Sequence, residues 1–315
     1  MYRDILEKKY IIGECYHHDK GLNIGYGVDD NYVRYMLVSC ISFINNNGNI
    51  NIHIVTDGIS KEYIDLIRLY SERYKVAFTI YMINSLDIKL PIINNGLTIG
   101  TYFRIFFPYF LDNVERLLYL DADVICCGNI SDLFYIELAD NIIAAAPDVI
   151  KMQERIRDLK IRNSHYYINA GVLLINVRKW IDENIDIEII KAIEKYGKKI
   201  RYEDQDAINI VLDGRIRYIS SEYNCIDMRG DKAAKAKILH FASKPKPWDG
   251  WWQLNANYND TTGEIYRKNE KDIFGENEVR KKSLRYFLKW VIKRIFYKTN
   301  LSDNRKQPDI NFTSR

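Results

Sequence analysis

Short apolar runs alternate with helical patterns along most of the chain, and this alternation limits the fold more than any other feature. Runs of strand length occupy residues 22–28, 51–56, 76–83, 117–120, 142–146 and 171–177. Helical patterns at 32–45, 60–74 and 98–111 separate the first four runs, with Ser60 in the N-cap position. Strands joined by helices form βαβ units. The sequence therefore predicts an α/β fold with a mostly parallel sheet covered by helices on both faces.

The composition is that of a folded protein, with 47% hydrophobic and 28% charged residues in a chain of 315. Five cysteines without a Cys-x-x-Cys spacing argue against a disulfide framework or a structural zinc site, and favour a reducing cytosol. We expect neither a signal peptide nor a transmembrane helix. Asn, Asp, Thr and Gly accumulate at 252–272, which predicts a break between residues 1–252 and a C-terminal segment, 253–315.

Two aspartates, Asp121 and Asp123, end the apolar run at 117–120, with only Ala122 between them. Neighbouring carboxylates at the end of a buried strand repel each other and are costly to desolvate. A hard divalent cation such as Mg²⁺ or Mn²⁺ removes the repulsion, and in proteins it commonly also binds substrate phosphates. A solvated loop that caps the following short helix is the alternative interpretation, and the spacing alone does not decide between them.

His240 and the loop after it favour the metal site. His240 interrupts a short apolar run, and Ser-Lys-Pro-Lys-Pro-Trp follows at 243–248. A histidine in an apolar run is often a plain core residue, but a neutral imidazole also suits Mn²⁺ as a third ligand. A loop with two lysines that two prolines hold in shape suits a phosphate.

Six ordered blocks of the chain resemble glycosyltransferase family 8. They lie at 26–32 (YGVDDNY), 101–104 (TYFR), 118–123 (LYLDAD), 167–176 (YINAGVLLIN), 204–209 (DQDAIN) and 240–248 (HFASKPKPW). The resemblance implies a GT-A fold and retaining, metal-dependent transfer of a sugar from a UDP-sugar. The opening block and the basic tail are most similar to members that extend the outer core of enterobacterial lipopolysaccharide.

The resemblance also implies a role for each matching position. Asp121, Asp123 and His240 would bind the metal, Mn²⁺ or Mg²⁺. The positions that would bind the nucleotide sugar are Gly27, Asp29, Asn31, Arg104, Asn169, Ser243 and Lys246. Those that would act on the transferred hexose are Asp148, Asp204 and Gln205. The family often has glycine where this chain has Ser243, so a hydroxyl there would either crowd the phosphates or donate to them.

Structural alternatives remain open for several of these residues. Asn169 and Gly171 also suit a tight entry into a strand, and Arg104 suits an ion pair on a helix surface. Asp29 and Asn31 also suit capping of the helix that begins near residue 32.

The expected reaction is transfer of glucose or galactose from UDP-sugar to a hydroxyl of the lipopolysaccharide core, forming an α linkage. Attack from the face that UDP leaves is one route, and double displacement through Asp148 or Asp204 is the other. The alternatives to this function are a family 8 transferase with another glycan acceptor and a glycan-binding module without catalysis.

Residues 281–298 carry most of the basic character of a chain whose net charge is +4. Seven basic residues and no acidic one occur there: Lys281, Lys282, Arg285, Lys289, Lys293, Arg294 and Lys298. Apolar residues recur between them at steps of three and four, which predicts an amphipathic basic helix. We expect this helix to lie on the anionic inner membrane surface of a cytoplasmic protein. Packing on the catalytic domain or dimerisation is the alternative. We expect no nucleic-acid partner, because no recognition motif occurs.

Overall fold

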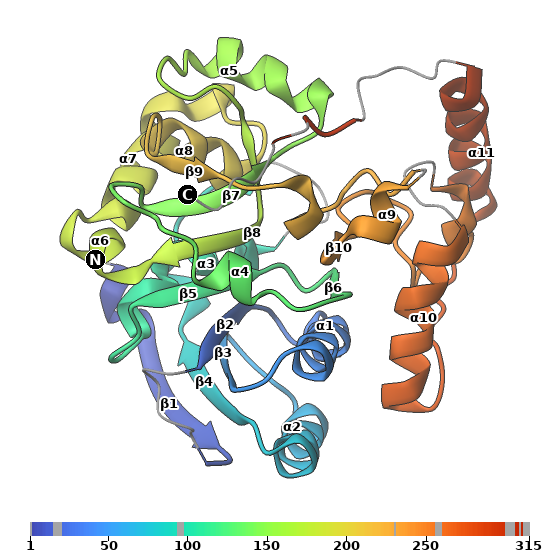
Figure 1. The fold of residues 1–315 in the computed structure, drawn as a ribbon, viewed down its shortest axis with the longest axis horizontal. Helices are drawn as coiled ribbons and strands as arrows, with labels where there is room; N and C mark the ends of the chain where they lie inside the picture. Colours follow the sequence, from blue (N-terminus) through green and yellow to red (C-terminus); the bar gives the residue numbers. More distant parts are fainter. Residues whose placement is uncertain are drawn as a thin grey trace.

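The computed structural model describes residues 2–14, 21–92, 98–229, 231–255, 260–299, 306–308 and 310, and in this part of the chain an eight-stranded sheet forms the centre (Figure 1). The strand order is β1-β4-β3-β2-β5-β8-β7-β9. The bounds are β1 Leu6–Ile12, β2 Leu22–Gly27, β3 Ile50–Thr56, β4 Ala77–Ile83, β5 Arg116–Leu120, β7 Ile143–Pro147, β8 Ile168–Asn176 and β9 Ile216–Tyr218. Strands β4, β3, β2 and β5 are parallel, whereas β1 and β8 run antiparallel to their neighbours. The predicted α/β fold with a mostly parallel sheet is confirmed.

Helices cover both faces of this sheet, and each face has its own hydrophobic core. Strand β5 shows how one strand serves both cores, because successive side chains point to opposite faces. Leu118 and Leu120 lie in the core beneath α1 and α2, while Leu117 and Tyr119 lie in the core beneath α3, α6, α7 and α8. The helix bounds are α1 Val33–Asn46, α2 Lys61–Tyr74, α3 Phe103–Phe106, α4 Ser131–Phe134, α5 Glu154–Leu159, α6 Val177–Asp182, α7 Ile185–Tyr196, α8 Glu203–Val211 and α9 Lys232–Lys235.

The segment at 98–111, predicted as one helix, is three short pieces. A 3₁₀ turn, η3 (Ile99–Tyr102), leads into α3, and a second 3₁₀ turn, η4 (Phe107–Phe110), follows. Pro108 lies in the first turn of η4 and has no N–H to donate, so an α-helical ladder cannot continue through it. In this broken path Arg104 is buried and does not lie on a helix surface.

Most of the segment in which we predicted a break is helix α10 (Asp260–Phe274). Tyr266 of α10 is fully buried in the same core as α1, and Arg34 of α1 pairs with buried Glu270 at 2.9 Å. Gly263 allows the close approach, because a Cβ there would lie 1.9 Å from the ring of Trp252. Helix α10 is therefore packed against the fold, and its buried side chains include the polar Thr262 and Glu270.

Helix α11 (Leu284–Thr299) runs along the edge of the molecule beyond α10 (Figure 1). It overlaps the predicted basic helix, although its side chains from residue 293 onward lie outside the described part, as does Cys15. Among the residues that the structure describes, none of the helices has both the length and the apolar character that crossing a membrane requires. The four described cysteines are free thiols.

Candidate active site

A small second sheet brings His240 to the two aspartates. Strand β6 (Val124–Cys126) pairs antiparallel with β10 (Ile238–His240), and the register sets His240 opposite Val124. The main chain of Asp123 also accepts a hydrogen bond from Phe241 at 2.9 Å. This pairing joins segments that are more than a hundred residues apart in the sequence.

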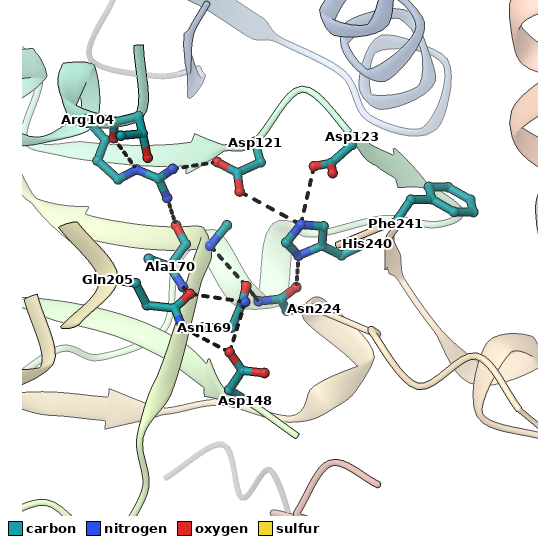
Figure 2. Close-up of polar contacts among 12 residues, drawn as sticks. Arg104, Asp121, Asp123, Asp148, Asn169, Ala170, Gln205, Asn224, His240 and Phe241 are labelled. Carbon is teal, nitrogen blue, oxygen red and sulfur yellow. Dashed lines mark hydrogen bonds and ion pairs between the residues drawn. The ribbon is translucent and has the colours of Figure 1, made fainter. Parts of the chain in front are cut away.

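The ligand atoms of Asp121, Asp123 and His240 lie within 4.8 Å of one another. His240 Nε2 is 3.3 Å from Asp123 Oδ1 and 3.8 Å from Asp121 Oδ2, and Figure 2 shows the ring facing both carboxylates. His240 is 2% exposed, so its ring position is set by the protein around it. The structure thus brings together the three residues predicted as metal ligands.

Asn224 sets the tautomer of His240. Its Oδ1 is 2.8 Å from His240 Nδ1, and its Nδ2 donates to Asn169 Oδ1 at 3.0 Å. An amide oxygen can only accept, so Nδ1 carries a proton, and in the neutral imidazole the lone pair is then on Nε2, which faces the aspartates. Two carboxylates and a neutral imidazole are a donor set that suits Mn²⁺. The residues present therefore fit a divalent cation.

Gly171 leaves the space in which this cluster forms. A Cβ at residue 171 would lie 2.2 Å from His240 Cε1 and 2.8 Å from Asp121 Oδ2. The main chain of Gly171 also accepts from the Asp121 N–H at 2.8 Å, next to the β5–β8 pairing. The glycine therefore leaves room for His240 and Asp121 to meet, which is more than the tight strand entry that we left open.

Lys246 neutralises part of the charge on Asp123. Its Nζ donates to Asp123 Oδ2 and, at 2.6 Å, to the carbonyl of Phe241. Burial opposes the ionisation of Asp123, but the positive charge of the Lys246 ammonium outweighs it and holds the pKa of this carboxyl below its ordinary value. Asp123 is therefore ionised at neutral pH.

Arg104 connects the aspartate pair to the first turn of α8. Its Nη2 is 2.9 Å from Asp121 Oδ1, and its Nε is 2.9 Å from Asp204 Oδ2. Nη1 donates to the carbonyl of Ala170, and the guanidinium lies 4.7 Å from the ring centroid of Tyr119. The alternative of a surface ion pair does not hold, because Arg104 is 7% exposed and pairs with the buried Asp204 as well as with Asp121.

Asp204 is held by Arg104 and by Thr101, whose hydroxyl donates to Oδ1 at 2.9 Å. Burial raises the pKa of Asp204 to about 6, although the Arg104 charge acts in the opposite direction. Asp204 is thus a carboxylate close to its titration point in the physiological range.

Asp148, Asn169 and Gln205 form a hydrogen-bonded network beside the metal cluster (Figure 2). Asn169 Nδ2 donates to Asp148 Oδ2 and to Gln205 Oε1, both at 3.2 Å, and Gln205 Nε2 donates to Asp148 Oδ2 at 3.0 Å. Burial raises the pKa of Asp148, against the hydrogen bonds that it accepts. The three side chains come from the end of β7, the start of β8 and the start of α8.

A cavity of about 430 Å³ opens at the carboxyl ends of β2 and β5. Six of the predicted residues line it: Gly27, Asp29, Arg104, Asp121, Asp123 and Lys246. Asp148, Asn169, Asp204 and Gln205 are not part of the lining. The predicted groups therefore divide into a cavity wall and a polar network behind it, with Arg104 and Asp121 between them.

Asn31 and Ser243 do not line this cavity. Asn31 is exposed, and its N–H donates to Asp29 Oδ1 at 3.0 Å. The Ser243 hydroxyl lies 3.0 Å from Asn255 Nδ2. Asp29 accepts the hydrogen bond that closes this turn. No side chain caps the N-terminus of α1, so helix capping does not explain why Asp29 and Asn31 occur here.

Gly27 lines the cavity, yet its lack of a side chain has a reason inside the protein. A Cβ there would lie 2.9 Å from Phe103 Cβ and 3.4 Å from the Tyr119 hydroxyl. The glycine allows β2 to pack against α3, which carries Arg104. Close approach of a ligand is thus not the only demand on this position.

Sequence reasoning missed Tyr32 and Lys244, which also line the cavity, and Asn224. Lys244 lies in the loop with two lysines, so its positive charge could have predicted a place in the phosphate-binding part of the cavity. Tyr32 follows the Asp29 block directly. Asn224 has no sequence signal, because only the packing of β10 against the segment before it brings Asn224 to His240.

Comparisons with known proteins agree with this geometry. Residues 23–252 match the sequence profile of Glycosyl transferase family 8. A lipopolysaccharide 1,2-glucosyltransferase of Escherichia coli is 29% identical over 257 residues, covering 75% of this chain and 74% of that protein. A lipopolysaccharide 1,3-galactosyltransferase of Salmonella typhimurium is 31% identical over 249 residues, covering 73% of each.

Among solved structures, the galactosyltransferase LgtC in complex with donor and acceptor sugar analogues superposes with a TM-score of 0.69. It is 23% identical, and the match covers 80% of this chain and 96% of that chain. At this identity the likeness establishes the fold, which is the GT-A type. The profile match covers more than half of the chain, so the protein belongs to glycosyl transferase family 8.

Proposed function

We propose that this protein transfers a hexose, glucose or galactose, from a UDP-sugar to a hydroxyl of the lipopolysaccharide core, with retention of the α configuration. The observation that carries the proposal is the position of Asp121 and Asp123: they line the cavity and also contact His240, which Asn224 links to the polar network. One wall thus suits a nucleotide diphosphate and the network behind it suits a sugar. The names of the two bacterial relatives support lipopolysaccharide as the acceptor.

Asp121, Asp123 and His240 would hold a divalent cation, Mn²⁺ or Mg²⁺. The two carboxylates lose their mutual repulsion there, and the unprotonated Nε2 of His240 completes the set. When bound, the cation supplies positive charge that stabilises the departing diphosphate.

The cavity wall would bind UDP. Asp29 can accept from the uracil N–H, Lys244 and Lys246 line the cavity, and the Lys246 ammonium lies against Asp123. Lysine binds phosphate as a point charge. Because Arg104 is already engaged by two carboxylates and a carbonyl, its role would be to hold Asp121 and Asp204 in place as well as to add positive charge.

Asp148, Asn169, Asp204 and Gln205 would surround the transferred hexose. A site built from polar groups selects one epimer strongly, because a misplaced hydroxyl leaves buried partners unpaired. The Gln205 amide is a poor nucleophile, but its dipole can stabilise the positive charge that develops on the anomeric carbon.

Same-face attack is the route that the site favours. The bond from the anomeric carbon to UDP breaks with its electron pair on UDP, the acceptor oxygen bonds to that carbon, and the acceptor proton passes to the β-phosphate oxygen of UDP. Asp148 and Asp204, the candidate nucleophiles for double displacement, are both buried and hydrogen-bonded, and burial raises the pKa of each. A covalent hexose trapped on either residue would reverse this preference.

Transfer to another glycan is the second candidate. Glycosyltransferase GlyE of Streptococcus pneumoniae is 27% identical over 254 residues, so the scaffold is not confined to proteins named for lipopolysaccharide. A binding module without catalysis is the third candidate, and it would have no need for the metal cluster.

We also propose that residues 1–252 provide the catalytic function and that 253–315 attach the enzyme to the cytoplasmic face of the inner membrane. Leu284, Leu288 and Ile292 form an exposed line along α11. Lys281, Arg285 and Lys289 form an exposed basic line with the same spacing. An apolar line beside a basic one suits the headgroup region of an anionic bilayer.

The test is a panel of UDP-sugars with lipopolysaccharide core oligosaccharide as acceptor, with Mn²⁺ or with EDTA, and with the product linkage determined by NMR. We expect one hexose to be transferred with α linkage only when metal is present. Asp123→Asn should reduce the rate by roughly a hundredfold or more while circular dichroism stays unchanged, since one charged ligand is lost. Metal-independent transfer, or wild-type rates in this variant at limiting Mn²⁺, would contradict the metal assignment.

A further inference from the structure

Gln307 is buried behind the active site, although its side chain is polar. It is 3% exposed, and the short C-terminal segment that carries it lies over the catalytic fold, away from α11 (Figure 1). Its Nε2 donates to the carbonyls of Asn224 at 2.8 Å and Pro147 at 3.1 Å. Its Oε1 accepts from the N–H groups of Ile226 at 2.9 Å and Asp227 at 3.4 Å. A carboxamide has two N–H donors and two lone pairs, so main-chain groups use its full capacity.

The four bonded groups belong to two loops, and each loop carries a residue of the site. Pro147 ends β7 and directly precedes Asp148. Asn224 follows η7 (Ser221–Tyr223) and contacts both His240 and Asn169 through its amide. The carbonyl of Lys306 also accepts from the Ile150 N–H at 2.7 Å. The C-terminal segment therefore joins the Asp148 loop to the Asn224 loop.

We propose that Gln307 is a positioning residue of the transferase site, which holds the Asp148 loop and the Asn224 loop in register. The proposal rests on the proposed function and adds a residue from outside the family match, which ends at 252. Gln307 acts through main-chain groups of the two loops. Its loss would shift Asp148 relative to Asn169 and would loosen the support of His240 by Asn224.

The part of the cavity proposed to bind UDP should not change when Gln307 is replaced. None of the four residues that Gln307 bonds lines the cavity, and the part of the wall formed by Gly27 and Asp29 belongs to β2 and the turn after it. A positioning role therefore predicts a loss of turnover and of metal affinity, with UDP affinity unchanged at saturating Mn²⁺. A purely structural role predicts lower thermal stability without this division.

Three variants of the full-length protein separate the possibilities. Gln307→Ala removes all four hydrogen bonds. Gln307→Glu keeps the size and the acceptor for Ile226, but it sets a carboxylate against the carbonyls of Pro147 and Asn224. Lys306→Ala is the matched control, because it changes an exposed side chain and leaves the main-chain bond to Ile150 in place.

The experiment measures kcat for hexose transfer, the Mn²⁺ concentration for half-maximal rate, and the Kd of UDP by calorimetry at saturating Mn²⁺. We expect Gln307→Ala and Gln307→Glu to lower kcat roughly tenfold and to raise the Mn²⁺ requirement several-fold, with the Kd of UDP within about twofold of wild type. Lys306→Ala should match wild type. Unchanged kcat in Gln307→Glu, or a loss of UDP affinity equal to the loss of kcat, would overturn the proposal.

Hydrogen exchange read by mass spectrometry provides a readout that does not depend on turnover. Exchange should rise in peptides that contain the amides of Ile150, Ile226 and Asp227 in both Gln307 variants, and not in Lys306→Ala. Unchanged exchange would overturn the proposal even if kcat falls. If wild type transfers no hexose, the proposed function fails, while the exchange result still decides whether Gln307 holds the two loops.

Discussion

Gly171 is the position at which one methyl group should disable the metal cluster. In Gly171→Ala the new Cβ would meet His240 Cε1 at 2.2 Å, a distance that real Cβ atoms do not tolerate, so the ring or the strand must move. Because His240 is buried and bonded to Asn224, the ring has little freedom to adapt. We expect the Mn²⁺ requirement for transfer to rise by roughly 10–100-fold, which is typical when the support of a metal ligand is disturbed.

The matched control for this change is Gly48→Ala, because a Cβ at residue 48 would meet nothing within 4 Å. Mn²⁺ titration of transfer activity, and of Mn²⁺ binding by electron paramagnetic resonance, would compare the two variants. Equal metal affinity in both would show that the cluster is not the metal site.

Asp204 should make stability depend on pH in a defined direction. Burial raises its pKa to about 6, while an unfolded chain ionises at roughly pH 4. Between about pH 4 and pH 6 the folded protein therefore keeps a proton on Asp204 that the unfolded chain releases. Above about pH 6 the buried carboxyl is ionised and lowers the free energy of unfolding. This loss of stability becomes smaller as the pH falls toward about 4. Between pH 4.5 and 7.5 we expect wild type to lose about 2 kcal/mol of unfolding free energy relative to Asp204→Asn.

Urea unfolding of both proteins at pH 4.5, 6.0 and 7.5 measures this difference, and other titrating groups largely cancel in the comparison. A difference that stays constant across the three pH values would show that Asp204 titrates at an ordinary pKa.

At the residue scale, the sequence predicted the groups whose signal is local and missed those whose role comes from packing. Asp121 and Asp123 are recognisable because two carboxylates end one apolar run. Asn224 is not, since its neighbours in sequence say nothing about His240. Ser243 stays a prediction: its position in the family block implies the phosphates, and in the structure its hydroxyl lies 3.0 Å from Asn255 Nδ2.

Helix α8 depends on Asp206, the second aspartate of the Asp-Gln-Asp block. Its carboxylate has no solvent exposure and accepts from Arg155, from the Tyr167 hydroxyl at 2.8 Å and from the N–H of Arg201 at 2.7 Å. These bonds fix the first turn of the helix that carries Asp204 and Gln205. Asp206→Asn should lower the unfolding free energy by about 3 kcal/mol, because it leaves Arg155 buried with a weaker partner.

Asp158→Asn is the matched control for this prediction. Asp158 pairs with the same Arg155 at 3.0 Å, but its side chain is 39% exposed. Exposed pairs contribute at most about 1 kcal/mol, so we expect a small effect on urea denaturation and none on kcat. If the two variants lose equal stability, Asp206 does not anchor α8.

At the element scale, alternating apolar runs were enough to predict β2 to β5 and the helices α1 and α2, because each run is buried and bounded by turn residues. The segment at 98–111 was predicted as one helix, and Pro108 is the reason that it is not. The edge strand β1 was not predicted, since lysines and glutamate dominate its exposed face. The pairing of β6 with β10 was also beyond the sequence: both strands have three residues, and their register is set by the tertiary fold.

At the scale of the whole molecule, the C-terminal part contacts the fold in two separate places, through α11 and through Gln307. Helix α11 docks through one side, where Phe287 packs 4.7 Å from the ring of Trp251 and the Tyr286 hydroxyl donates to Asp249 at 3.2 Å. The chain beyond it returns to the active site at Gln307. Truncation before α11 would therefore remove the proposed membrane contact and the proposed positioning residue together, so point substitutions on the exposed side of α11 are the cleaner test of attachment.

Two substitutions on that exposed side should release the protein from anionic vesicles. Leu288 and Ile292 are 50% and 53% exposed, and they continue the line that begins at Leu284, with the basic line alongside. Leu288→Gln combined with Ile292→Gln removes most of the apolar contact. Replacing Lys281, Arg285 and Lys289 by glutamine should weaken binding by about 3 kcal/mol, or roughly a hundredfold, at about 1 kcal/mol for each basic residue.

Cosedimentation with phosphatidylglycerol vesicles measures these changes, and Leu86→Gln is the matched control, because Leu86 is 78% exposed on a separate 3₁₀ turn. We expect the control to bind like wild type and the basic-line variant to lose the salt dependence of binding. Donor hydrolysis without vesicles should stay normal in all variants, since none of the changed residues lines the cavity. If the apolar-line variant still binds vesicles, or if it converts a dimer into a monomer in analytical ultracentrifugation, this face of α11 is a protein interface and the membrane proposal is wrong.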